Sequence, residues 1–93
     1  MKLKWSKESE KPLNDNETMK FINRVGKGWR LPTKEEVMAE YTLHPEEFKE
    51  NYIRCSSGGN WVVLRLSDGY WYYNMYGNIY YVRCVKDIES EGE

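Results

Sequence analysis

The sequence predicts an α+β fold, in which two or three helices are followed by an antiparallel β-meander. The first observation is that residues 61–85 alternate between apolar and polar positions around two hairpin signals, Asp68-Gly69 and Gly77-Asn78. The second is that the chain before this stretch contains two helix starts with the spacing of a capping box. Helices and strands therefore occupy separate parts of the chain.

The length and composition fit one small domain. We expect residues 1–93 to form a single domain with an ordered core over about 2–87. A net charge of -1 gives no general attraction for nucleic acid or an anionic membrane. No apolar run is long enough for a signal peptide or a membrane span, so we expect a cytoplasmic protein. In that compartment Cys55 and Cys84 are free thiols, whereas in an exported form they could form one disulfide.

The first part of the chain predicts a strand and a helix. Residues 2–6 alternate polar and apolar side chains, which suits a strand at a sheet edge. Asn14 is a good N-cap with Glu17 three positions later, and Gly26 and Gly28 end the helix that follows. The residues of this helix expected to face inward are Met19, Ile22 and Val25.

The middle of the chain predicts a second helix and a short third one. Thr33 and Glu36 have the spacing of another capping box. The inward positions of the helix that follows are Val37, Met38 and Tyr41. Pro45 is well placed as the first residue of a short helical turn that runs to Glu50, with Phe48 as its anchor.

The last part of the chain predicts the sheet and its register. Residues 52–57 form a strand or a lead-in to one, and Gly58-Gly59-Asn60 turns the chain into the meander. The hairpin at Asp68-Gly69 pairs Leu66 with Trp71, and the hairpin at Gly77-Asn78 pairs Tyr76 with Ile79. The two registers agree on one core face, made of Val62, Leu64, Leu66, Trp71, Tyr73, Met75, Tyr80, Val82 and Cys84.

The opposite face of this predicted sheet holds the candidate site. It carries Trp61, Val63, Arg65, Ser67, Tyr70, Tyr72, Asn74, Tyr76, Ile79, Tyr81, Arg83 and Val85. Arg65, Tyr72 and Arg83 form one cross-strand row, and the candidate binding residues in the adjoining rows are Trp61, Tyr76 and Tyr81. Aromatic and arginine side chains are enriched in binding hot spots. The alternative is that the N-terminal strand, a helix or a second copy of the chain covers this face.

Three segments resemble a known family. They are residues 28–37 (GWRLPTKEEV), Ser56-Ser57 and residues 82–85 (VRCV). In these the chain resembles the small bacterial and phage domains with a C-type lectin-like fold, related to the formylglycine-generating (sulfatase-modifying) enzyme superfamily. The resemblance implies that the N- and C-terminal strands pair, with residues 3–5 beside residues 79–85. It says little about function, because the group includes enzymes and receptor-binding proteins.

The chain departs from that family in its chemistry. The family's enzymes use two reactive cysteines that lie close together, whereas Cys55 and Cys84 are far apart in this sequence. The calcium loop of the sugar-binding lectins is absent, so calcium-dependent sugar binding is not expected. His44 is the only histidine, and we expect it to be exposed. Neither a catalytic residue, a metal nor a cofactor is expected.

These observations favour a non-enzymatic binding module. We expect a small phage or bacterial accessory protein that binds a protein partner, and in one version inhibits it. The alternative is a domain that binds a small ligand, a nucleotide or a sugar, on the row of Arg65, Tyr72 and Arg83. A minimal enzyme of the formylglycine-generating type is the third hypothesis, which the cysteine spacing disfavours. We expect a monomer or a homodimer that binds neither nucleic acid nor a membrane.

Overall fold

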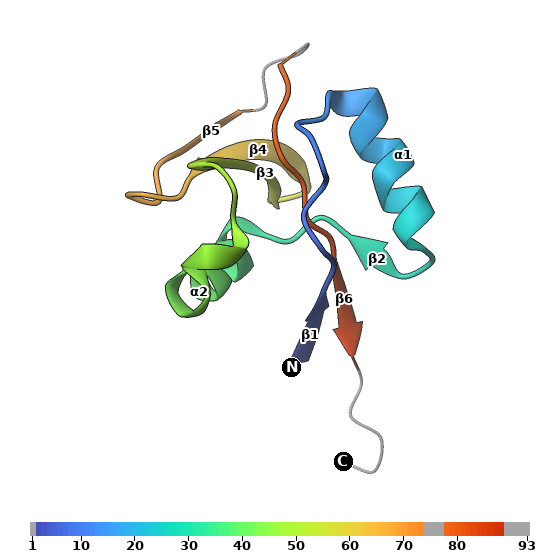
Figure 1. Ribbon diagram of the computed structural model, residues 1–93, viewed down its shortest axis with the longest axis horizontal. Coiled ribbons are helices and arrows are strands. Elements are labelled where there is room, and N and C mark those ends of the chain that lie inside the picture. The colour runs from blue at the N-terminus through green and yellow to red at the C-terminus, as the bar shows by residue number, and fades with distance from the viewer. Residues whose placement is uncertain (1, 74–77, 89–93) are drawn as a thin grey trace.

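The computed structural model describes residues 2–73 and 78–88, and it is an α+β fold with two antiparallel sheets (Figure 1). Its elements are β1 (Lys2–Trp5), α1 (Asp15–Val25), β2 (Trp29–Arg30), α2 (Lys34–Leu43), the 3-10 helix η1 (Pro45–Glu47), β3 (Tyr52–Ser57), β4 (Asn60–Arg65), β5 (Trp71–Tyr73) and β6 (Val85–Ile88). One sheet has the strand order β1-β6-β2 and the other β3-β4-β5. Within the described ranges, neither α-helix is long and apolar enough to cross a bilayer.

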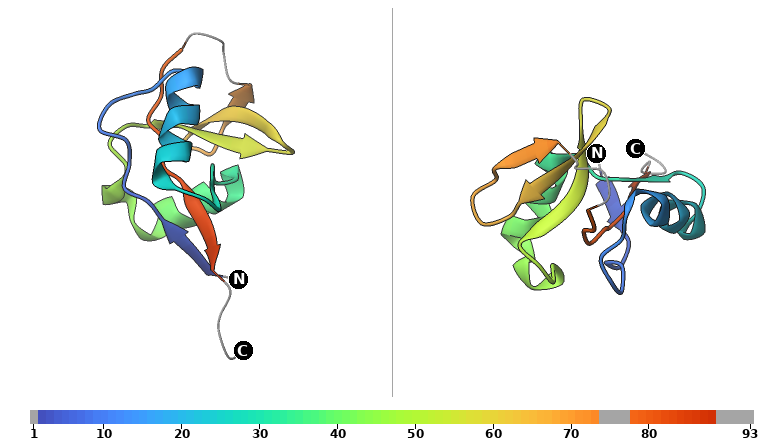
Figure 2. Two further views of the ribbon diagram at one scale, coloured as in Figure 1. Left: turned by 90° about the vertical axis from the view of Figure 1, so that its right-hand side faces the viewer. Right: turned by 90° about the horizontal axis from the view of Figure 1, so that it is seen from above.

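The two ends of the chain run together between the two helices. Seen from above, β3, β4, β5 and α2 lie to one side, α1 lies to the other, and β1 and β6 are between them (Figure 2). β1 and β6 are antiparallel, with Lys2 opposite Ile88 and Trp5 opposite Val85. The expected pairing of the N- and C-terminal strands is therefore confirmed, but the partners of residues 3–5 are residues 85–87 and not the expected residues 79–85.

Both α-helices begin as the sequence predicts. The Asn14 side chain accepts a hydrogen bond from the Glu17 N–H at 2.8 Å, and the Glu17 carboxylate accepts one from the Asn14 N–H at 3.0 Å. Thr33 and Glu36 make the same reciprocal pair at the start of α2. Phe48 is buried directly after η1, so its predicted role as an anchor is confirmed, although η1 ends earlier than expected, at Glu47.

The inward face of α1 differs from the prediction. Thr18 is the residue of α1 that is fully buried, Phe21 and Ile22 are partly buried, and Met19 is exposed. The reason is that the first turn of α1 points polar groups, rather than apolar ones, at the sheet, as described below. Of the three predicted inward residues, Ile22 and Val25 are half-buried and Met19 is exposed, so apolar spacing identified the helix and two of its inward positions.

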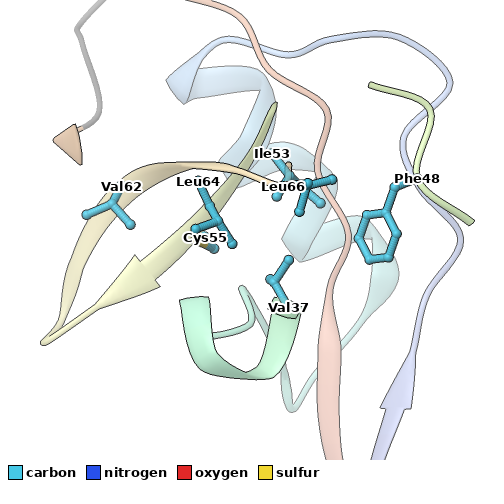
Figure 3. Close-up of a cluster of buried hydrophobic side chains, with 7 residues drawn as sticks. All are labelled: Val37, Phe48, Ile53, Cys55, Val62, Leu64 and Leu66. Atoms are coloured by element: carbon cyan, nitrogen blue, oxygen red, sulfur yellow. The ribbon is translucent and has the colours of Figure 1, made fainter. Parts of the chain in front are cut away.

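The main core lies between α2 and one face of β3 and β4 (Figure 3). The seven buried side chains drawn there are Val37, Phe48, Ile53, Cys55, Val62, Leu64 and Leu66. A second, smaller cluster joins Leu13, Leu31 and Val82, with Phe21, Ile22 and Trp61 packed against it. Burial of this apolar surface is the main stabilising contribution to a domain of this size.

The hairpin between β3 and β4 forms as expected, but the next one has a different register. Gly58 and Gly59 have φ angles of 59° and 87°, which suit a two-residue hairpin loop. Beyond β4, Leu64 and not Leu66 lies opposite Trp71. The loop is longer by two residues because the Asp68 carboxylate accepts the Tyr70 N–H at 3.0 Å, so the Arg65 N–H reaches the Tyr70 carbonyl at 2.7 Å. A shift of two keeps every side chain on its predicted face.

The predicted third strand of the meander is wrong. Residues 79–85 do not pair with β5; instead Tyr80 bridges Leu13 in antiparallel fashion and Tyr81 bridges Ile53 in parallel fashion. The chain continues beside its own N-terminal segment, where the Ser9 and Ser6 hydroxyls accept the N–H groups of Val82 and Cys84 at 3.1 and 2.9 Å. The proposed turn at Gly77-Asn78 falls partly on residues 74–77, which lie outside the described ranges.

The predicted core face is confirmed for the residues of β4 and for Leu66, Val82 and Cys84. The prediction is wrong for the residues of the edge strand β5. Val62, Leu64, Leu66, Val82 and Cys84 are buried. By contrast, Trp71 and Tyr73 are exposed by 37% and 66%, and Tyr80 is only partly buried. The exposed pair lies on β5 at the edge of its sheet, and Met75 falls outside the described residues.

We predict that Asn14→Ala lowers the free energy of unfolding by about 1 kcal/mol, because it removes the oxygen that caps α1. Urea denaturation followed by circular dichroism measures this change. Asn23→Ala, at an exposed position of the same helix, is the matched control and should leave the midpoint nearly unchanged. Equal effects of the two substitutions would show that the cap contributes nothing specific.

Candidate functional site

The face of β3-β4-β5 opposite the main core is built from cross-strand rows. The first row contains Tyr52, Arg65 and Tyr70, because Tyr52 lies opposite Arg65 and the Arg65 N–H bonds to the Tyr70 carbonyl. The next row contains Arg54, Val63 and Tyr72, and the third pairs Ser56 with Trp61. Arg65, Tyr72 and Trp61 thus share one face as predicted, but their neighbours come from β3 and not from residues 79–85.

Arg65 is held in a fixed orientation within the first row. Its guanidinium makes two contacts with the Asp68 carboxylate, Nε to Oδ1 at 3.0 Å and Nη2 to Oδ2 at 2.6 Å. It also lies 5.3 Å from the centroid of the Tyr70 ring. The guanidinium holds the pKa of Asp68 at about 2, well below its ordinary value. Tyr70 is 59% exposed, so this row presents an arginine and two tyrosines to the solvent side.

Arg83 does not belong to this face, which corrects the predicted row of Arg65, Tyr72 and Arg83. It is only 5% exposed and lies between the rings of Trp5 and Phe48, at 4.8 and 5.1 Å from their centroids. Its Nε donates to the Ser6 carbonyl at 3.0 Å, and its Nη1 is 3.4 Å from the Glu47 carboxylate. Because residues 79–85 leave the meander, Arg83 joins the N-terminal segment to the end of η1 and to Phe48. Tyr76 lies outside the described residues.

A buried arginine that the sequence analysis did not single out holds the middle of this face. Arg54 is fully buried, and its guanidinium reaches the first turn of α1. Nη1 donates to the Leu13 carbonyl at 2.9 Å and to the Thr18 hydroxyl, while Nη2 is 3.1 Å from the Asp15 carboxylate. Nη2 also donates to the Asn78 carbonyl at 3.2 Å. The one feature of the sequence that could have indicated its burial is its position in the middle of a strand, between Ile53 and Cys55.

Two rings complete the surroundings of this guanidinium. Arg54 lies 5.7 Å from the ring centroid of Trp61 and 5.4 Å from that of Tyr80. Burial lowers the pKa of Arg54, and the negative charge of Asp15 opposes this effect. The start of α1 and residues 78–80 therefore cover the middle row, while the first row stays accessible. The expected alternative, that part of the chain covers this face, holds for the middle row.

A small hollow adjoins the exposed row. It has a volume of about 220 Å³ and is lined by Pro12, Glu50, Tyr52, Ile79, Tyr80 and Tyr81. Tyr81, one of the predicted binding residues, is therefore close to Tyr52. We call the combined surface of Tyr52, Arg65, Tyr70, Tyr72, Tyr80 and Tyr81 the tyrosine face. Its rings do not merge into one aromatic cluster; within the described part of the chain, the ring pair found on it is Tyr70 with Tyr72, at 6.3 Å.

The two cysteine thiols lie inside the fold and not at its surface. Cys55 and Cys84 are free and buried, which agrees with the expected free thiols. Burial raises the pKa of each to about 12, so the thiolate that would act as a nucleophile is suppressed.

His44 is exposed, as expected, and has two acidic neighbours. Its Nδ1 lies 3.6 Å from the Glu46 carboxylate. With Glu47 these side chains place one potential metal ligand each within 4.8 Å of one another, the one such group in the described ranges. All three are exposed, and surface ion pairs of this kind are common without a metal.

We predict that Arg54→Met lowers the free energy of unfolding by about 3–5 kcal/mol, because it breaks a buried ion pair and removes the donor of the hydrogen bonds to the Leu13 and Asn78 carbonyls. Urea denaturation provides the measurement. Arg65→Met removes an arginine of the same sheet face whose guanidinium is accessible, and it should have little effect on the midpoint. If the two variants lose the same stability, Arg54 does not have the structural role assigned to it.

Comparisons with models of known protein families, with curated proteins and with solved structures found no match to this chain.

Proposed function

We propose that this chain is a non-enzymatic binding module that contacts a protein partner through its tyrosine face. The observation that carries the proposal is the accessible row of Tyr52, Arg65 and Tyr70, in which Asp68 fixes the arginine in place. Tyrosine and arginine are enriched among the residues that dominate binding energy. A tyrosine ring also offers a large contact area while losing little conformational entropy. A prearranged row of this kind reduces the side-chain conformational entropy that is lost on binding.

The finer fold assignment is also a proposal. A C-type lectin-like fold is supported by the pairing of β1 with β6, by the two helices that precede β3-β4-β5, and by the segment at Arg30 and Leu31 that leads into α2. In this setting the chain is a small phage or bacterial accessory protein. One version of its role is to inhibit the partner by covering a surface that the partner needs.

The two other hypotheses have less support. A nucleotide or sugar would have used the row of Arg65, Tyr72 and Arg83, but Arg83 lies elsewhere in the fold. The hollow beside Tyr52, at about 220 Å³, is smaller than the roughly 300–1,000 Å³ of most small-molecule sites. An enzyme of the formylglycine-generating type would need an accessible thiolate, whereas burial raises the pKa of Cys84 to about 12.

We predict that affinity purification from the source cells, followed by mass spectrometry, recovers a partner with the unchanged chain and loses it with Tyr70→Ala or Arg65→Ala. Each substitution removes an accessible side chain of the first row, and a hot-spot residue is expected to weaken binding at least tenfold. Tyr73→Ala is the matched control, since Tyr73 is an exposed tyrosine of β5 on the opposite face of the same sheet.

Two results would contradict this function. One is recovery of nothing except the chain itself at high expression. The other is equal loss of the partner with Tyr73→Ala, which would place binding on the other side of β5. Thermal stabilisation by nucleotides or sugars alone, without a protein partner, would favour the small-ligand alternative.

A further inference from the structure

The hollow at the edge of the tyrosine face has one charged group in its lining. Rings and apolar groups form most of its wall, through Tyr52, Tyr80, Tyr81, Pro12 and Ile79. The exception is Glu50, whose carboxylate has neither a hydrogen bond nor an ion pair with the described residues. An acidic group among apolar walls attracts a cation and disfavours an anion.

The positive side chains near this hollow already interact with other groups of the chain. Lys49 lies 5.3 Å from the Tyr81 ring, donates to the Ser9 carbonyl at 3.2 Å, and interacts with the charge of Glu8. Arg54 lies behind the Tyr80 ring and is paired with Asp15. Neither Lys49 nor Arg54 lines the hollow. The carboxylate of Glu50 therefore remains the group there without a compensating charge in the described structure.

We propose that this hollow accepts a cationic side chain, arginine or lysine, that the protein partner presents. The charged head would meet the Glu50 carboxylate, and the aliphatic stem would pack against Ile79 and Pro12. Tyrosine rings attract such cations through their π-systems. The inference rests on the proposed function, because it names the chemistry of the partner at the same face.

Other occupants fit less well. A phosphate or a carboxylate would be repelled by Glu50. An uncharged apolar side chain would remove water from the Glu50 carboxylate without giving it a partner, which is unfavourable. A whole nucleotide or sugar is large for about 220 Å³. A long side chain with an apolar stem and a positive end satisfies both the apolar lining and the single negative charge.

The test is a nuclear magnetic resonance titration of the complete chain with N-acetyl-arginine methylamide. We expect saturable shifts of the amide signals of Tyr52, Tyr80 and Tyr81, with a Kd on the order of 1–10 mM for so small a probe. The matched citrulline compound, which has nearly the same shape without the charge, should bind at least tenfold more weakly. Glu50→Gln should weaken the arginine probe to the same extent, because it removes the charge with little change of shape.

Controls and contrary outcomes are defined within the same experiment. Glu46→Gln changes an exposed acid that does not line the hollow, and it should leave binding unchanged. Equal binding of citrulline, unchanged binding by Glu50→Gln, or no saturable shift would each overturn the inference.

Failure of this inference can be told apart from failure of the proposed function. A partner that is lost with Tyr70→Ala but captured normally with Glu50→Gln would support the binding face and reject the cationic side chain. Saturable, charge-dependent binding of the arginine probe without any recovered partner would support the hollow and count against the proposed function. Loss of the captured partner with both variants would support both.

Discussion

The buried guanidinium of Arg54 is the interaction on which the arrangement of the chain depends. It connects β3 to the Leu13 carbonyl, to Asp15 and Thr18 in the first turn of α1, and to the Asn78 carbonyl. A buried charge is costly unless it is fully hydrogen-bonded and paired, and these acceptors meet that requirement. One consequence is that the middle of β3-β4-β5 is covered on both faces. The most accessible part of the outer face is thereby the row of Tyr52, Arg65 and Tyr70 and the hollow beside it.

Arg83 repeats the same arrangement 29 positions later in the chain. Each arginine follows a branched apolar residue and precedes a buried cysteine, in Ile53-Arg54-Cys55 and in residues 82–84. Each lies between two rings and beside one carboxylate, Asp15 for Arg54 and Glu47 for Arg83. These arginines join segments that are distant in sequence, so they belong to the framework of the fold. The arginine left at the surface of the tyrosine face, Arg65, is held by a neighbour in its own loop.

Short-range sequence patterns predicted the local structure well. They did not predict the contacts between segments that are distant in sequence. The caps at Asn14 and Thr33 and the turn at Gly58-Gly59 depend on residues within a few positions, so the sequence was sufficient for them. Alternation placed Arg65, Tyr72 and Trp61 on one face, because the period of a strand does not depend on its partner. It misplaced Arg83, since the choice between β5 and the N-terminal segment is made by side chains far away, such as the Ser6 and Ser9 hydroxyls. Arg54 was missed because its position in the middle of a strand does not tell a buried arginine from an exposed one.

Native-state hydrogen exchange on the Arg54→Met variant tests most directly whether this arginine holds the outer layer, which is the start of α1 together with residues 78–80, against β3-β4-β5. The Thr18 and Tyr80 N–H groups bond to the Asn14 and Leu13 carbonyls, in the segments that Arg54 joins. Their protection should fall by at least tenfold more than that of the amides that pair β3 with β4, because opening of the outer layer becomes a local event. Equal loss of protection at all these amides, or no loss at Thr18 and Tyr80, would contradict the account.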